Sequence, residues 1–477
     1  MASCLGGMPV PNRFTSGLSF VFALLALFAS HQARALNVEV ENFTLKNGMQ
    51  VVVIPDHRAP VVTQMVWYKV GAADEPPGEA GVAHFLEHLM FKGTDILGPG
   101  EFSKVIKKNG GNDNAFTSQD YTAYFQSIAK DRLELAMRLE ANRMQNLNLS
   151  DEVVLPERDV ILEERRMRVD NNPASKLGEQ IDAALYVSHP YGNPVIGWMP
   201  QVSALTRENA VRFYRTYYTP SNAILIIAGD VTAKDVRPLA EKYYGVLENT
   251  ATPPQRIRSQ EPEPVAARRL SLTDPRVAAP TWQRTYLAPS YQSAKATGQA
   301  EALDVLAQIL GGSTNSRLYQ GFVIEQKIAT QAGSYYSGGL KDYGNFGFYA
   351  VPANGTDMAS LEAAMDKAIA DIQEKGVSEE ELARAKNTMI AQATYALDSP
   401  SSLARLFGQS LAIGGSIEDV TGWSDRIAKV SAAQVQEAAR SILDIRASVT
   451  ATLLPEKANS SSAEAAPLMQ APVPEQN

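Results

Sequence analysis

The sequence predicts a two-domain α+β protein, in which each domain has a mixed β-sheet packed against helices. Strand-like and helix-like segments alternate from Leu36 onward, which is typical of sheets covered by helices. The 477 residues, 45% of them hydrophobic, exceed the length of one ordinary domain. The order of segments also partly repeats after the proline- and charge-rich stretch at 252–264, TPPQRIRSQEPEP. These three observations favour a duplicated architecture.

The first predicted domain covers residues 36–250. FTLKNGMQVVVIPD at 43–56 predicts a hairpin with its turn at Asn47-Gly48. Further β-branched and aromatic runs predict strands at 61–72, 114–129 and 221–231. Apolar residues at helical spacing predict helices at 80–92, 99–109, 132–146 and 156–170.

A linker at 251–266 precedes the second predicted domain, 267–456. This domain has strand-like regions at 268–287, 330–352 and 447–455, and helix-like regions at 301–312, 357–375 and 378–397. The final segment, 457–477, is poor in large apolar groups and predicts a disordered tail.

One pair of helices supports the repeat. VAHFLEHLM in the first half aligns with LDVLAQIL in the second, and the apolar frame of the helix is retained. The polar residues of the first helix are not retained, because His84, Glu87 and His88 lie opposite Asp304, Ala307 and Gln308. We therefore expect the first domain alone to carry the functional site.

The first 35 residues predict a secretory signal. An apolar run, SGLSFVFALLALFAS at 16–30, follows Arg13 and precedes a small-residue site, ARA at 33–35. The run is shorter than the roughly 20 residues of a membrane span. We expect cleavage after Ala35 and a periplasmic protein with no stable membrane insertion. A retained signal is the alternative, and it would tether the protein to the membrane.

Charge and cysteine content narrow the function classes. Cleavage would remove Arg13, Arg34 and no acidic residue, so 44 basic residues become 42 against 52 acidic ones, a net charge of −10. This net negative charge argues against a nucleic-acid partner, because a protein binds nucleic acid largely by neutralising its phosphates with basic residues. The single cysteine, Cys4, leaves with the signal. Any metal site must therefore use nitrogen and oxygen ligands.

The segment GVAHFLEHLMFKGT at 81–94 carries two of the five histidines. On a helix, His84 and His88 project from one face, one turn apart, and Glu87 lies beside them. An unpaired carboxylate in so apolar a segment is costly. Imidazole pairs bind zinc, and a carboxylate can activate a zinc-held water. H-x-x-E-H is the inverted zinc-protease pattern, so we expect a zinc ion here.

A catalytic zinc needs a third protein ligand and an open position. The predicted helix at 156–170 offers Glu157, Glu163 and Glu164. Glu157 and Glu164 are seven residues apart and share a face, whereas Glu163 points elsewhere. Spacing alone does not choose among the three. His57 and His189 are interpreted as locally bonded histidines.

Three motifs, HFLEHLMFKGT, GGNDNAFTSQDYTAYF and ERDVILEERRM, resemble the pitrilysin/insulinase family of inverted zinc peptidases, in a bacterial branch similar to the mitochondrial processing peptidase. The resemblance spans about residues 38–455. It implies that His84, His88 and Glu164 bind one Zn²⁺ per chain and that Glu87 is the general base.

The resemblance assigns three further residues. It implies that Glu157 helps to organise the site. It also implies that Asn114 and Ala115 lie on an edge strand near the zinc and bind substrate backbone by strand addition.

The second half departs from the family pattern. An Arg and, seven residues later, a Tyr hold substrate near the zinc in many members, but these positions fall here on Val323 and Thr330. Arg317, Tyr335 and Tyr336 are nearby but out of register. Since some branches divide the work between two chains, we expect a dimer in which a homologous chain supplies the Arg/Tyr pair.

The predicted function is zinc-dependent endopeptidase action on peptides or unfolded polypeptides, as the zinc-bearing subunit of a two-chain enzyme. One alternative is a proteolytically silent metal-binding subunit that docks a partner or presents peptides. Another is a zinc carrier, which would leave Glu87 without a role.

Overall fold

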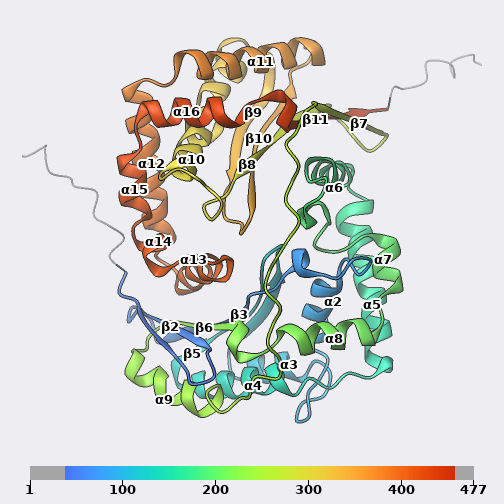
Figure 1. Ribbon diagram of the computed structural model, residues 1–477, viewed down its shortest axis with the longest axis vertical. Helices are drawn as coiled ribbons and strands as arrows, with labels where there is room; N and C mark the ends of the chain where they lie inside the picture. The colour runs from blue at the N-terminus through green and yellow to red at the C-terminus, as the bar shows by residue number, and fades with distance from the viewer. Residues whose placement is uncertain (1–37, 457–477) are drawn as a thin grey trace, which may run out of the picture.

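The computed structural model describes residues 38–456, which form two sheets with associated helices, one above the other in Figure 1. The predicted signal at 1–35 and the predicted tail at 457–477 lie outside the described residues. Within residues 38–456, no helix combines the length and apolar character that a membrane span requires.

The first sheet has six strands. β2 and β6 are parallel, and all other neighbours are antiparallel. The predicted hairpin turn is confirmed, because Thr44 pairs with Gln50 and Gly48 has a φ of 90°, which glycine adopts readily. In sheet order the strands are β1 (Glu41–Thr44), β2 (Gln50–Pro55), β6 (Ala223–Gly229), β3 (Val61–Tyr68), β5 (Thr122–Ala129) and β4 (Asn112–Thr117).

Helices of the first half cover one face of this sheet. Their shared core includes Val66 of β3 together with Phe85 and Leu86 of α2, all fully buried. α2 is thus held against the sheet by its apolar side. The helices are α2 (Val82–Leu89), α3 (Glu101–Lys108), α4 (Leu133–Gln145), α5 (Asp151–Arg165), α7 (Met199–Ala204), α8 (Arg207–Tyr217) and α9 (Ala233–Tyr243).

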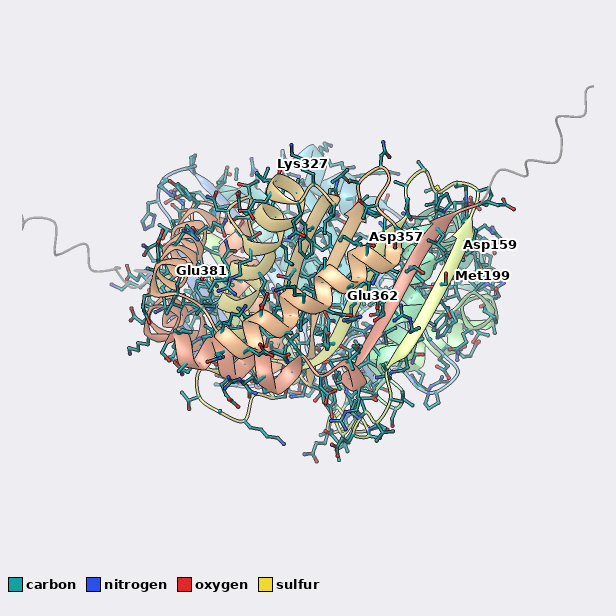
Figure 2. The ribbon with its side chains drawn as sticks, turned by 90° about the horizontal axis from the view of Figure 1, so that it is seen from above. Asp159, Met199, Lys327, Asp357, Glu362 and Glu381 are labelled. Carbon is teal, nitrogen blue, oxygen red and sulfur yellow. The ribbon has the colours of Figure 1, made fainter. Side chains whose placement is uncertain are left out.

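The second sheet repeats the first. Its order, β7-β11-β8-β10-β9, matches β2-β6-β3-β5-β4, and the one parallel pair, β7 with β11, corresponds to β2 with β6. Figure 2 shows β7 and β11 side by side, next to α11 with Glu362. The strands are β7 (Arg268–Asp274), β11 (Ser448–Pro455), β8 (Thr281–Pro289), β10 (Tyr343–Pro352) and β9 (Ala329–Ser337).

The prediction of two similar α+β domains is therefore confirmed, while the boundaries 36–250, 251–266 and 267–456 stay a prediction. Helices of the second half are α10 (Gln299–Gly311), α11 (Met358–Lys375), α12 (Glu379–Ala396), α14 (Ile417–Thr421), α15 (Trp423–Lys429) and α16 (Ala432–Ile442).

Two helices cross between the halves. α6 (Pro173–Leu185) packs on the second sheet, where Leu177 meets Val449 in one buried cluster. α13 (Pro400–Ile413) packs on the first sheet, where Phe407 joins Trp67. A Cβ on Gly408 of α13 would lie 2.0 Å from the Trp67 ring, so only glycine allows this approach. Figure 1 shows both helices between the two sheets.

The segment between the sheets, residues 251–266, has no helix or strand but is tied down by charge. The Arg258 guanidinium is 4% exposed and contacts Asp74 and Asp120 of the first half and Asp342 of the second. Arg256 also binds Asp74. These ion pairs connect the segment to both halves.

Candidate metal centre

Helix α2 presents its polar side away from the sheet. His84 and His88 lie on one face, with ring centroids 4.8 Å apart. Phe85, Leu86 and Leu89 occupy the opposite side and are fully buried in the core of the first half. The apolar residues therefore fix which way the two imidazoles point.

Helix α5 brings the acidic partners. Glu164 Oε2 lies 3.4 Å from His88 Nε2 and 3.9 Å from His84 Nε2. Glu157, two turns earlier on the same face, lies 2.9 Å from His88 Nδ1. Glu163 is 60% exposed and pairs only with Arg166 among the described residues. The two glutamates predicted to share a face thus both reach the histidines.

The arrangement fits a tetrahedral zinc ion. One ligand atom from each of His84, His88 and Glu164 lies within 4.8 Å of the others, and residues 38–456 contain no other such group of three. Zinc bonds of about 2.0–2.2 Å place tetrahedral ligands roughly 3.4 Å apart, and Glu164 Oε2 lies 3.4 Å and 3.9 Å from the two imidazole nitrogens. The donors are two imidazoles and a carboxylate, which leaves a fourth position open.

A second layer of charged residues holds these groups. Glu157 Oε2 contacts Lys92 Nζ at 2.5 Å while Oε1 faces His88. Arg168 Nη1 contacts Glu164 Oε1 at 2.7 Å. Neither contact was predicted from the sequence. Arg168 follows Glu164 by four residues, and this i, i+4 spacing was the available signal. Lys92 gave no such signal, because its partner Glu157 lies on another helix.

The two histidines differ in their pKa values. Burial and the adjacent His88 lower the pKa of His84 to about 4, so its ring is neutral with a free lone pair. Burial also acts to lower the pKa of His88, but bonding to Glu157 and Glu164 outweighs it and raises this pKa to about 9. A metal bound to His88 Nε2 would therefore take the place of a proton.

Glu87 is buried beside the histidines, and its Oε2 accepts a hydrogen bond of 2.6 Å from the Thr117 hydroxyl. Burial raises the pKa of Glu87, and the Thr117 hydroxyl acts in the opposite direction. A carboxyl with a raised pKa can take and return a proton near neutral pH. Sequence reasoning missed Thr117, which lies at the end of the NDNAFT motif.

Among the described residues the strand β4 pairs only with β5, so it is an edge strand next to α2, as expected. Asn114 is exposed and Ala115 is half-buried. The Ala115 N–H donates to the Asn114 side chain at 2.9 Å. A substrate strand added to this edge would exchange that local bond for an intermolecular one.

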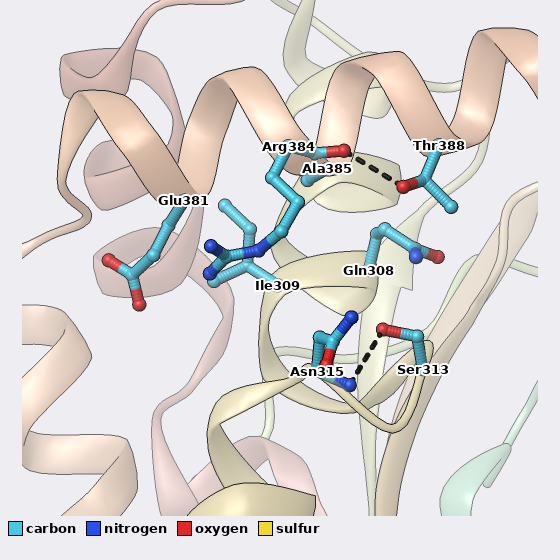
Figure 3. Close-up of a pocket in the computed structure, with 8 residues that line it drawn as sticks. All are labelled: Gln308, Ile309, Ser313, Asn315, Glu381, Arg384, Ala385 and Thr388. Atoms are coloured by element: carbon cyan, nitrogen blue, oxygen red, sulfur yellow. Dashed lines mark hydrogen bonds between the residues drawn. The ribbon is translucent and has the colours of Figure 1, made fainter.

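The helix of the second half that corresponds to α2 is α10, and it carries no histidine–glutamate group. Asp304 accepts a hydrogen bond from the Tyr291 hydroxyl, and Ala307 has no polar group. Gln308 lines a small pocket with Arg384 and Thr388 of α12, shown in Figure 3. The expectation that the first half alone contains the histidine–glutamate group holds for the described residues.

The two positions of the missing Arg/Tyr pair carry no charge or phenol. Val323 lies in a π-helical turn, η6 (Tyr319–Glu325), and Thr330 lies in β9. Neighbouring Arg317 is bound by Glu381 at 2.6 Å. His57 and His189 lie apart from the metal-type group and face Asp230 and Asp342 respectively.

Known families match most of the chain. The family described as insulinase (peptidase family M16) matches residues 50–198, and the peptidase M16 inactive domain matches residues 204–389. The zinc protease PqqE of Helicobacter pylori is 33% identical over 443 residues, which cover 92% of this chain and 98% of that protein. This chain belongs to the insulinase, or M16 peptidase, family.

Other similar proteins and structures support the same family. A probable mitochondrial-processing peptidase subunit beta of Arabidopsis thaliana is 26% identical, over 87% of this chain and 78% of that protein. The crystal structure of a protease from Helicobacter pylori has a TM-score of 0.82 and 32% identity, covering 88% of this M16 chain and all of that one. The first half of the periplasmic protease PqqL from Escherichia coli has the same fold, with a TM-score of 0.75 at 21% identity, covering 89% of this chain and 94% of that one.

Proposed function

We propose that this M16 family chain is a zinc-dependent endopeptidase that hydrolyses peptides or unfolded polypeptides. The observation that carries the proposal is the convergence of His84, His88 and Glu164 from two helices, with Glu87 beside them. Relatives that are named zinc proteases support it.

The chemistry assigns each residue a task. His84, His88 and Glu164 would hold one zinc ion per chain, which would polarise a bound water and the scissile carbonyl. Glu87 would take a proton from water as the water oxygen bonds to the scissile carbonyl carbon, and would return that proton to the amine that leaves when the C–N bond breaks. The Thr117 hydroxyl donates a hydrogen bond of 2.6 Å to the Glu87 carboxylate and so restricts its orientation.

Glu157 and the β4 edge complete the site. Glu157 fixes the His88 ring through Nδ1, which leaves Nε2 free for the metal. Asn114 and Ala115 pair with the substrate backbone, which places a peptide bond alongside α2. Since strand addition uses main-chain groups, it suits extended chains of varied sequence.

We also propose that this chain is the zinc-bearing subunit of a dimer. The residues at the Arg/Tyr positions, Val323 and Thr330, cannot hold substrate by charge or hydrogen bonding as an Arg and a Tyr would. A homologous chain would supply that pair. The signal segment, with Arg13 and the run at 16–30, supports a periplasmic location.

The full chain, alone and mixed with a candidate partner chain, tests this function. Peptide cleavage that requires the mixture and is abolished by Glu87→Gln, with zinc content unchanged, supports the two-chain enzyme. Cleavage by the chain alone contradicts the partner requirement but supports the peptidase. Zinc binding without cleavage in any mixture favours the silent subunit, which Val323 and Thr330 motivate.

A further inference from the structure

The helix that carries His84 and His88, α2, has a glycine at its N-cap. The first N–H groups of any helix lack partners within the helix, and a Ser, Thr, Asp or Asn at the N-cap ordinarily accepts from them. The N-cap of α2 is Gly81, with a φ of 98°. A Cβ there would lie 2.8 Å from the Ile196 carbonyl oxygen. No capping side chain fits at this position, so the cap must come from elsewhere.

Glu75 provides it from the preceding loop. Its Oε2 accepts from the Gly81 N–H at 2.9 Å, and its Oε1 accepts from the Ala83 N–H at 2.8 Å. Gln201 accepts from the neighbouring Ala80 N–H at 2.8 Å. Both carboxylate oxygens of Glu75 are therefore used. Burial raises the pKa of this carboxyl well above its usual range, and the bonds from the Gly81 and Ala83 N–H groups act in the opposite direction. Ala83 directly precedes the ligand candidate His84.

The loop that carries Glu75 is itself anchored. Asp74, the adjacent residue, binds Arg256 and Arg258 of the segment between the sheets. The Ala72 N–H donates to the Ser118 carbonyl at 3.0 Å. Ser118 follows Thr117, the residue bonded to Glu87. The loop thus has contacts at the start of α2 and just beyond the end of β4.

We propose that Glu75 is a positioning residue, which sets the rotation and axial position of α2 so that both imidazoles reach Glu164. The inference rests on the proposed zinc site. It differs from general stabilisation because the bonds of Glu75 end at the turn that carries His84. A small rotation of this helix would move His84 and His88 together relative to α5.

The test compares Glu75→Gln with Glu79→Gln in the full chain. Glutamine retains one acceptor oxygen but points an NH₂ group at a second N–H. Glu79 lies in the same loop, and its side chain binds only the surface Arg212 among the described residues. We expect Glu75→Gln to weaken zinc binding about tenfold in chelator competition, as outer-shell changes do. We expect Glu79→Gln to leave it unchanged.

Hydrogen exchange of the metal-free protein gives an independent readout. The Gly81 and Ala83 amides should be protected in the parent chain and should exchange faster in Glu75→Gln only. In an active preparation, Glu75→Gln should lower kcat and leave KM unchanged. Equal exchange and equal zinc affinity in the two variants would overturn the proposal. Unprotected Gly81 and Ala83 amides in the parent chain would overturn it without any variant.

The two proposals fail in different ways. A parent chain that binds no zinc defeats the proposed function, whereas the exchange comparison still decides whether Glu75 caps α2.

Discussion

Replacing Arg258 with methionine removes one guanidinium from a site that holds three carboxylates. Arg258 Nη2 lies 2.8 Å from Asp74 Oδ1, and Nη1 lies 2.8 Å from Asp342 Oδ2 and also contacts Asp120. Asp120 is fully buried, and Asp74 is nearly so at its side chain. Methionine keeps most of the aliphatic volume of arginine but removes the positive charge that neutralises these carboxylates. The change therefore isolates the electrostatic contribution.

The expected cost is large because the pairs are buried. Removing one partner of a buried ion pair costs about 3–5 kcal/mol. Asp342 gives a partial check: burial acts to raise its pKa, but bonding to His189 and Arg258 lowers it from 3.8 to about 2. At 1.36 kcal/mol per pH unit, this shift corresponds to about 2 kcal/mol near neutral pH, of which Arg258 contributes a part and His189 the rest. We therefore expect the variant to lose roughly 3–5 kcal/mol of unfolding free energy at pH 7.

The pH dependence follows from the depressed pKa. The stabilisation from Asp342 is fully present above its ordinary pKa of 3.8 and is lost as the pH falls toward about 2. The difference in unfolding free energy between the parent chain and Arg258→Met should therefore shrink as the pH falls from 4 to 2.

Urea unfolding of the full chain, with midpoint and slope at each pH, provides the assay. Arg446→Met is the matched control, because Arg446 and Asp444 are 62% and 41% exposed and such pairs contribute about 0–1 kcal/mol. An Arg258→Met variant as stable as this control would refute the reasoning, as would a difference that does not change with pH.

Two further predictions concern the metal centre. Glu157→Gln should weaken zinc binding by about 10–100-fold in chelator competition, because His88 Nδ1 loses its carboxylate partner. Glu163→Gln, on the exposed side of the same helix, should leave zinc binding unchanged. Equal losses in the two variants would contradict the role of Glu157 in holding His88. Thr117→Val removes the hydroxyl that counteracts burial at Glu87, so the pKa of Glu87 should rise and the acidic limb of kcat/KM should move to higher pH. A limb that stays in place or moves to lower pH would show that Glu87 does not set it.

Local patterns predicted which side chains share a helix face, whereas the choice of Glu164 among three glutamates came from the family resemblance. The i, i+4 spacing of His84 and His88 placed both rings on one face of α2. The seven-residue spacing of Glu157 and Glu164 placed both carboxylates on the α2-facing side of α5. The Asn47-Gly48 turn predicted the hairpin of β1 and β2, and the repeated order of elements anticipated the second sheet.

Relations between distant segments could not be predicted in this way. The exchange of α6 and α13 between the halves depends on which sheet face is left uncovered, and amphipathic spacing does not name a helix's partner. Neither helix was among the predicted elements. Proline and charge near 252–264 indicated a linker, but not that Arg258 would be buried against Asp120, 138 residues away. Glu75 offered no motif, since its role depends on the glycine at the start of α2.

The metal content of the intact, folded chain, measured with and without His88→Ala, tests the central claim most directly. We predict one zinc ion per chain in the parent protein and loss of that ion in His88→Ala, with the fold unchanged by circular dichroism. A folded parent chain that binds no zinc, or a His88→Ala variant that retains its full zinc content, would contradict the account.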